Sequence, residues 1–166
     1  NNIWIIDPID GTTNFLHGNP HFAISIALQN SDEIISGLVF DPIKNEMFYA
    51  EKNSGSYFNN KRIRVSKKKE LNQCLFATGG NKFRQVKLTT RKSGSAALDM
   101  AYVASGRYDG YFQENLNLWD IASGILLINE AGGIINSIDI KKKHGLEVIA
   151  SSANIKQKML KMLNNF

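Results

Sequence analysis

An apolar run that leads directly into two aspartates constrains this chain more than any other feature. Residues Ile3–Ile6 are typical of a short buried strand, and the segment Asp7–Phe15 (DPIDGTTNF) follows without a break. Pro8 has no backbone N–H to donate, so we expect the strand to stop there. Gly11 lets the backbone turn sharply or approach a ligand closely. The sequence therefore predicts a strand that ends in a tight loop carrying two carboxylates.

The residue types of this loop suit both a metal ion and a phosphate. Carboxylate, carbonyl and hydroxyl oxygens are hard ligands, which favour Mg²⁺ or Ca²⁺ over zinc. Backbone N–H groups that follow a glycine at the start of a helix can hold an anion. The same residues also fit an aspartate-rich turn in which Thr13 and Asn14 cap a helix. The loop alone does not decide between these two interpretations.

The first part of the chain predicts an antiparallel sheet. Residues 22–28 alternate large and small side chains, which indicates a strand. A hairpin is expected over 34–50 with its turn at 41–45, and a second over 55–65. The second hairpin turns at Asn59-Asn60, because asparagine tolerates the positive φ that a tight turn requires.

From about residue 75, strands alternate with helices, which indicates an α/β arrangement. The expected elements are strands at 75–78, 108–113, 134–140 and 148–150, helices at 95–105 and 119–131, and an amphipathic last helix. We divide the chain into residues 1–72, with the loop and the antiparallel sheet, and residues 73–166, the α/β part. Together they are expected to form one compact unit.

The second helix of this part opens with an acid. Trp119-Asp120 stands at the start of an apolar helix, where capping and the helix dipole alone would explain a carboxylate. Beside Asp7 and Asp10, however, Asp120 would supply the third carboxylate of a divalent metal site.

The composition limits which binding partners and which cellular compartment we expect for this protein. The chain has 20 Lys and Arg against 15 Asp and Glu, a net charge of +5, with lysine clusters at 67–69 and 141–143. A solvated surface explains these clusters, and a nucleic-acid patch is the alternative. Cys74 is the only cysteine, which fits a reducing compartment such as the cytoplasm. No apolar run approaches the roughly 20 residues that span a bilayer, so no membrane partner is expected.

Taken together, the motifs resemble the inositol monophosphatase family. Asp7–Phe15 is similar to its first signature, and Trp119–Gly124 followed by Glu130–Gly133 is similar to its second. Gly94–Ala104 and Gly55–Asn59 match further family stretches in the same order, so the resemblance covers nearly the whole chain. It implies a layered α+β or α/β sandwich, usually a homodimer, that hydrolyses phosphate monoesters with Mg²⁺.

The resemblance also implies residue roles. The implied metal ligands are oxygen atoms of Asp7, Ile9, Asp10 and Asp120. The implied substrate contacts are Gly11, Thr12, Ala96, Gln113 and Asp120. Thr12 and Asp10 are the implied catalytic residues, and the Thr12 hydroxyl resembles the group that orients the attacking water.

The expected function is hydrolysis of a small polyol phosphate, such as inositol monophosphate, by metal-activated water. One alternative keeps the chemistry and changes the substrate to a nucleotide 3′-phosphate, a sugar bisphosphate or histidinol phosphate. Another is an RNA- or transcription-associated factor with little catalysis, a role that the resemblance to bacterial family members implies.

Three departures from the family pattern affect these expectations. The family places a metal-binding glutamate upstream of its first motif, so we expect this sequence to be part of a longer chain. The family places a helix before residue 91, where only Gly79–Thr90 stands here. Gln113 occupies a position where the family often has glutamate, which changes what the side chain can donate and accept.

Overall fold

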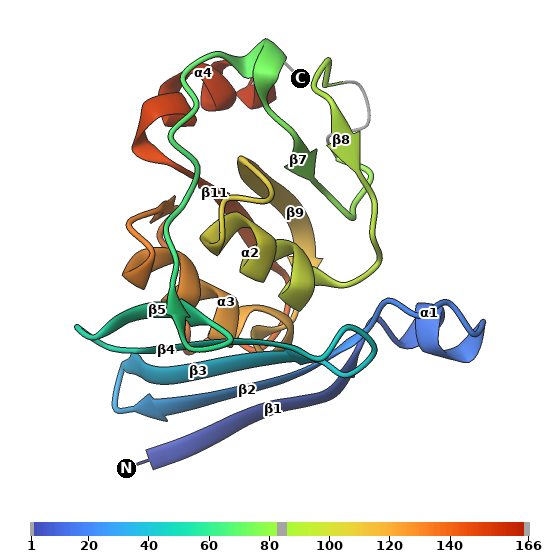
Figure 1. The fold of residues 1–166 in the computed structure, drawn as a ribbon, viewed down its shortest axis with the longest axis vertical. Coiled ribbons are helices and arrows are strands. Elements are labelled where there is room, and N and C mark those ends of the chain that lie inside the picture. The colour runs from blue at the N-terminus through green and yellow to red at the C-terminus, as the bar shows by residue number, and fades with distance from the viewer. Residues whose placement is uncertain (1, 83–85, 165–166) are drawn as a thin grey trace.

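The computed structural model describes residues 2–82 and 86–164, and it shows two sheets separated by helices (Figure 1). The first sheet is antiparallel with strand order β1-β2-β3-β4-β5-β6, and the second is mixed with order β10-β11-β9-β7-β8. Helices α2 and α3 lie between the sheets, and α4 covers the far side of the second sheet (Figure 1). The expected layered α+β sandwich, antiparallel first and mixed second, is confirmed.

The strands of the first sheet are β1 (Asn2–Asp10), β2 (Ala23–Asn30), β3 (Glu33–Asp41), β4 (Glu46–Glu51), β5 (Gly55–Phe58) and β6 (Lys61–Arg62). Those of the second are β7 (Phe76–Ala77), β8 (Thr90–Arg91), β9 (Gly110–Leu116), β10 (Ile134–Ile135) and β11 (Leu146–Ser151). The helices are α1 (Thr12–Leu16), α2 (Ala96–Ala104), α3 (Leu118–Glu130) and α4 (Ala153–Asn164), with a 3₁₀ turn at Leu71–Gln73. Among these described helices, none is both long and apolar enough to cross a bilayer.

The predicted turns form as their residue types require. The Asp41 carboxylate accepts hydrogen bonds from the backbone N–H groups of Ile43 (2.9 Å) and Lys44 (3.0 Å), which closes the turn between β3 and β4. Asn59 and Asn60 both adopt positive φ, 42° and 67°, between β5 and β6. The strands expected to reach residues 65 and 140 are shorter, because β6 ends at Arg62 and β10 at Ile135.

The expectation of a short buried strand stopping at Pro8 is wrong on both counts. The first strand lies at the edge of its sheet, and Trp4 is 63% and Ile6 52% exposed. It continues past Pro8 to Asp10 because the pairing with β2 shifts between Asp7 and Asp10, as in a bulge. A missing N–H is tolerated on an edge strand with such an irregularity. The strand thereby carries both aspartates into its final residues.

Small residues of β2 and β3 on the inner face of the first sheet let α3 approach closely at Ser123. Ser25 and Ala27 of β2 are buried, and the Ser25 hydroxyl lies 3.0 Å from that of Ser123 in α3. The Ser123 hydroxyl also donates to the Ile26 carbonyl at 2.9 Å. A Cβ placed on Gly37 would lie 3.0 Å from the Ser123 Cα. This contact positions the helix that carries Asp120.

The stretch Gly79–Thr90, where the family pattern places a helix, contains no helix among its described residues. Residues 83–85 lie outside the described part of the chain. The neighbouring expected helices at 95–105 and 119–131 are confirmed as α2 and α3.

The substitution Gly37→Ala tests the close packing of α3. The added methyl would press on helix backbone, which cannot move aside as a flexible side chain can. We expect the free energy of unfolding to fall by about 1–3 kcal/mol in urea titrations. Ser36→Ala, whose side chain lies on the outer face, is the control and should change it by less than about 0.5 kcal/mol. Equal effects of the two changes would contradict the packing argument.

Candidate metal and phosphate site

Three carboxylates converge where the first strand ends and α3 begins. One oxygen each of Asp7, Asp10 and Asp120 lies within 4.8 Å of the others. Asp10 is buried and the other two are half-buried. All three line a cavity of about 390 Å³. The structure thus brings Asp120 next to two acids that precede it by more than a hundred residues in the sequence.

The most buried of these acids is held by the start of α2. One Asp10 oxygen, Oδ2, accepts hydrogen bonds from the Ser95 hydroxyl and from the backbone N–H of Ala97, the latter at 2.9 Å. Ser95 also accepts from the N–H of Leu98 (3.3 Å) and so caps α2. Both bonds use the same Asp10 oxygen, which leaves the second one for a cation.

The other two carboxylates are fixed by their local backbone. Asp120 Oδ2 accepts from the N–H of Asn117 at 2.8 Å, which forms a capping box at the start of α3. Asp7 Oδ1 accepts from the N–H of Ile9 at 3.0 Å. The capping interpretation of Asp120 is therefore correct, and it does not compete with metal binding because the second oxygen stays available.

The electrostatics of the cluster favour a bound cation. Burial raises the pKa of Asp10 from 3.8 to about 7, opposed by the Ser95 and Ala97 bonds and supported by the charges of Asp7 and Asp120. Burial and the neighbouring Asp7 charge also raise the pKa of Asp120. Like charges held this close are unfavourable without a compensating positive charge. A divalent ion would supply that charge and return the acids to their ionised forms.

The loop between β1 and α1 has the shape that its glycine permits. Gly11 adopts φ +90°, and a Cβ there would lie 3.1 Å from the His21 carbonyl oxygen. The Thr12 hydroxyl donates to the Ile9 carbonyl at 2.9 Å, and a carbonyl oxygen retains a second lone pair for a ligand. The first N–H groups of a helix have no partner within it, and Gly11 and Thr12, at the start of α1, line the cavity.

The far wall of the cavity carries an oriented amide. The Tyr111 hydroxyl donates to Gln113 Oε1 at 2.8 Å, which assigns the amide nitrogen to the remaining side of the group. A Cβ on Gly79 would lie 2.0 Å from the same oxygen, so a larger residue there would displace the Gln113 amide from this position. Ala96, at the start of α2, also lines the cavity.

Sequence reasoning missed three residues that position the site. Ser95 and Asn117 hold Asp10 and Asp120 from the two helix starts. Asn14 joins the loop to the segment before α2, because its Nδ2 donates to the carbonyls of His21 (2.8 Å) and Ser93 (2.9 Å). A serine or asparagine before a helix is a recognisable cap signal, but that signal does not tell which distant carboxylate the residue also contacts.

Comparison with known proteins agrees with this geometry. The model of the inositol monophosphatase family matches residues 1–165. The inositol-1-monophosphatase of Rhizobium meliloti is 47% identical over 145 residues, which cover 78% of this chain and 54% of that protein. A putative Nus factor SuhB of Neisseria meningitidis serogroup A is 39% identical, over 97% of this chain and 68% of its own length. This chain therefore spans about half to two thirds of these relatives.

A solved structure shows the same fold. The extragenic suppressor protein suhB from Bartonella henselae superimposes with a TM-score of 0.91 at 43% identity, covering 98% of this chain and 73% of the other.

The raised pKa of Asp10 predicts a pH-dependent stability for the metal-free protein. Between about pH 4 and pH 7 the folded state binds more protons than the unfolded state, so stability falls as the pH rises through this window. The raised pKa of Asp10 corresponds to a loss of at most about 4 kcal/mol in the free energy of unfolding across this window. Asp10→Asn retains one oxygen for both donors and carries no charge, so in EDTA we expect it to be more stable than the wild type at pH 8 and similar at pH 4.5.

Thermal unfolding at both pH values measures this difference. Asp32→Asn, at an exposed position, is the control and should leave the difference between pH values as it is in the wild type. If Asp10→Asn raised the unfolding temperature equally at both pH values, the buried charge of Asp10 would not be the cause of the pH dependence.

Proposed function

Because this chain belongs to the inositol monophosphatase family, we propose that it forms the catalytic part of a Mg²⁺-dependent phosphate monoesterase. The observation that carries the proposal is the convergence of Asp7, Asp10 and Asp120 within 4.8 Å in a cavity. Oxygen ligands in this number suit Mg²⁺, which usually completes its shell with waters and substrate phosphate.

The residues of the loop and of α3 have different proposed roles. The three carboxylates and the Ile9 carbonyl would hold the cations, and Asp10 and Thr12 are the proposed catalytic residues. The N–H groups of Gly11 and Thr12 bind the phosphate oxygens, and the Thr12 hydroxyl, after leaving the Ile9 carbonyl, orients the attacking water. Divalent cations, when bound, would lower the pKa of water and neutralise phosphate charge.

The proposed substrate is a small polyol phosphate such as inositol monophosphate. Ala96, Gln113 and Asp120 line the cavity where the alcohol part would lie. The relative from Rhizobium meliloti, named for this activity, supports the choice. The oriented Gln113 amide favours the alternative substrates in one respect. Its nitrogen offers a hydrogen-bond donor, so a sugar bisphosphate, a nucleotide 3′-phosphate or histidinol phosphate with an acceptor near this wall would also fit.

Further properties of the whole protein are part of the proposal. Residues 1–72 and 73–166 act as one unit, which is supported by a single core cluster containing Phe48 from the first part and Tyr111 from the second. The family resemblance supports a homodimer, and the single cysteine is consistent with the cytoplasm. The Nus factor name of the Neisseria relative supports a transcription-associated role as the second candidate.

Asp120→Asn tests the proposed chemistry. An asparagine oxygen can still accept the Asn117 N–H bond, so the fold should persist. Loss of a metal-binding charge should lower Mg²⁺-dependent phosphate release from inositol monophosphate by more than about a hundredfold, the upper range for residues that only support metal ligands. The control Asp32→Asn should retain full activity. Turnover by the Asp120 variant at the wild-type rate would contradict the proposed function.

Gln113→Glu tests the substrate contact. A carboxylate accepts hydrogen bonds from hydroxyl groups and repels acceptor groups. The kcat/KM of the variant for inositol monophosphate should therefore rise relative to its kcat/KM for a sugar bisphosphate. We expect the ratio of the two kcat/KM values to change by about tenfold or more. Gln157→Glu, the same change at an exposed position of α4, serves as the control. An unchanged ratio would mean that this position does not contact the substrate.

A further inference from the structure

A second concave site lies at the N-terminus of α4. It is a cavity of about 340 Å³ between residues 64–67 and the first residues of the helix, and it shares no lining residue with the catalytic cavity. Two hydrogen bonds hold the segment against the helix. Asn154 Nδ2 donates to the Lys67 carbonyl (3.1 Å), and Lys158 Nζ donates to the Lys69 carbonyl (2.8 Å). We call this cavity the α4 groove.

One residue of the groove has an unused hydroxyl. Ser152 directly precedes α4, where serine ordinarily caps a helix, and it is only 3% exposed. Its Oγ is buried and has no hydrogen-bond partner within the described part of the chain. A buried hydroxyl without a partner is unfavourable and needs an explanation. The hydroxyl does not cap the helix, so it is available to a ligand in the groove.

The helix start itself attracts negative charge. The first N–H groups of α4 have no acceptor within the helix, and the dipole places partial positive charge there. The first turn contains no acidic side chain that would balance this charge. With Ser152, the groove therefore offers several hydrogen-bond donors and no anion of its own.

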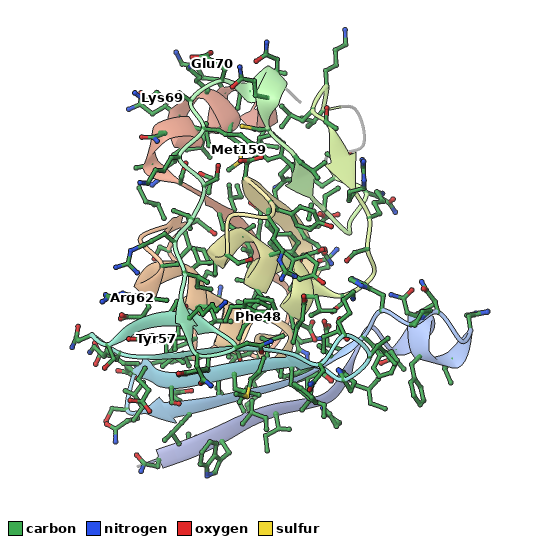
Figure 2. All side chains as sticks on the ribbon, in the orientation of Figure 1. Phe48, Tyr57, Arg62, Lys69, Glu70 and Met159 are labelled. Carbon is green, nitrogen blue, oxygen red and sulfur yellow. The ribbon has the colours of Figure 1, made fainter. Side chains whose placement is uncertain are left out.

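Cationic side chains surround the groove. Arg64 and Lys67 line it, and no carboxylate of the described residues lies within ion-pair distance of either. The segment 61–69 has six Lys or Arg among its nine residues and no acid. Figure 2 labels Arg62 and Lys69 near the two ends of this segment, which runs along one side of the molecule.

Some neighbouring cations are already paired. Lys68 pairs with Asp109 at 2.9 Å, and Lys158 pairs with Glu70 at 2.9 Å. Arg64 Nη1 donates to its neighbour's carbonyl, that of Ile63, at 3.0 Å. Arg64 and Lys67 thus keep their positive charge for the groove, and the other cations of segment 61–69 lie outside its lining.

We propose that the α4 groove binds a phosphate group. A phosphate group carries one negative charge as a diester and up to two as a monoester, and its tetrahedral oxygens can accept from two cations, the Ser152 hydroxyl and the N–H groups of the helix start at once. A planar carboxylate has two oxygens and would leave part of this set unused. The site lies outside the acidic cluster and functions without a metal ion. The phosphate comes either from a small phosphorylated compound or from the backbone of a polynucleotide.

Phosphate titration in EDTA tests the site. Chelation keeps divalent cations away from the acidic cluster, and the amide resonances of Ala153 and Asn154 in ¹⁵N NMR spectra report on the groove directly. We expect these resonances to shift and saturate with inorganic phosphate, and the double variant Arg64→Gln/Lys67→Gln to abolish the shifts. The matched variant Lys142→Gln/Lys161→Gln, with the same loss of charge elsewhere, should bind as the wild type. Equal shifts with chloride at the same ionic strength would overturn the proposal.

Ser152→Ala separates a ligand contact from a structural role. Because Ser152 Oγ makes no hydrogen bond, Tm without phosphate should stay unchanged, while phosphate affinity falls by about tenfold or more, as for the loss of a hydrogen bond to a charged group. An equal drop in Tm with and without phosphate would show a helix cap and overturn the assignment of Ser152.

A short single-stranded oligonucleotide identifies the source of the phosphate. If it shifts the same resonances at lower concentration than inorganic phosphate, and Arg64→Gln/Lys67→Gln weakens it, the groove serves a polynucleotide. If only inorganic phosphate shifts them, the ligand is a small phosphorylated compound. If neither ligand shifts the Ala153 and Asn154 resonances, the groove is not a phosphate site.

Discussion

Three like charges within 4.8 Å of one another are the constraint on which the rest of this structure depends. Bringing Asp7, Asp10 and Asp120 together is unfavourable, and the fold compensates with a hydrogen-bond donor for each. Two of these donors belong to the starts of α2 and α3, where the helix dipoles also favour negative charge. Burial of the Asp10 carboxylate, and to a smaller degree the charges of Asp7 and Asp120, still raise the pKa of Asp10. The metal-free site is therefore an unfavourable arrangement that a divalent cation would relieve.

The position of the third carboxylate depends on packing far from the cavity. Helix α3 can bring Asp120 next to the first strand only because β2 and β3 present small residues, above all Gly37, beneath Ser123. Larger side chains there would lift the helix from the sheet. The helix start would move with it, and the distances within the acidic cluster would grow. The small residues of the sheet thus act on the site through the helix, without contacting it.

Much of this could be predicted from the sequence, because local chemistry determined it. Asp41 and the pair Asn59-Asn60 specify their turns, and Ser95 marks the start of α2. Exposure of the first strand could not be predicted, since an apolar run looks the same in the core and at a sheet edge. Its passage through Pro8 depends on a bulge set by the partner strand. The second contact of Ser95, with Asp10, joins positions 85 residues apart, and no local pattern encodes such a contact.

Two sites of opposite intrinsic charge follow from this arrangement. The cavity with the acidic cluster is negative, so in the proposed function it would repel a phosphate until cations fill the cluster, and its affinity for substrate would be coupled to metal. The α4 groove is positive by its own side chains and attracts a phosphate whether or not metal is present. They share no lining residue. A ligand retained at the groove would remain bound while the cavity gains and loses its ions, so binding at the two sites can be regulated independently.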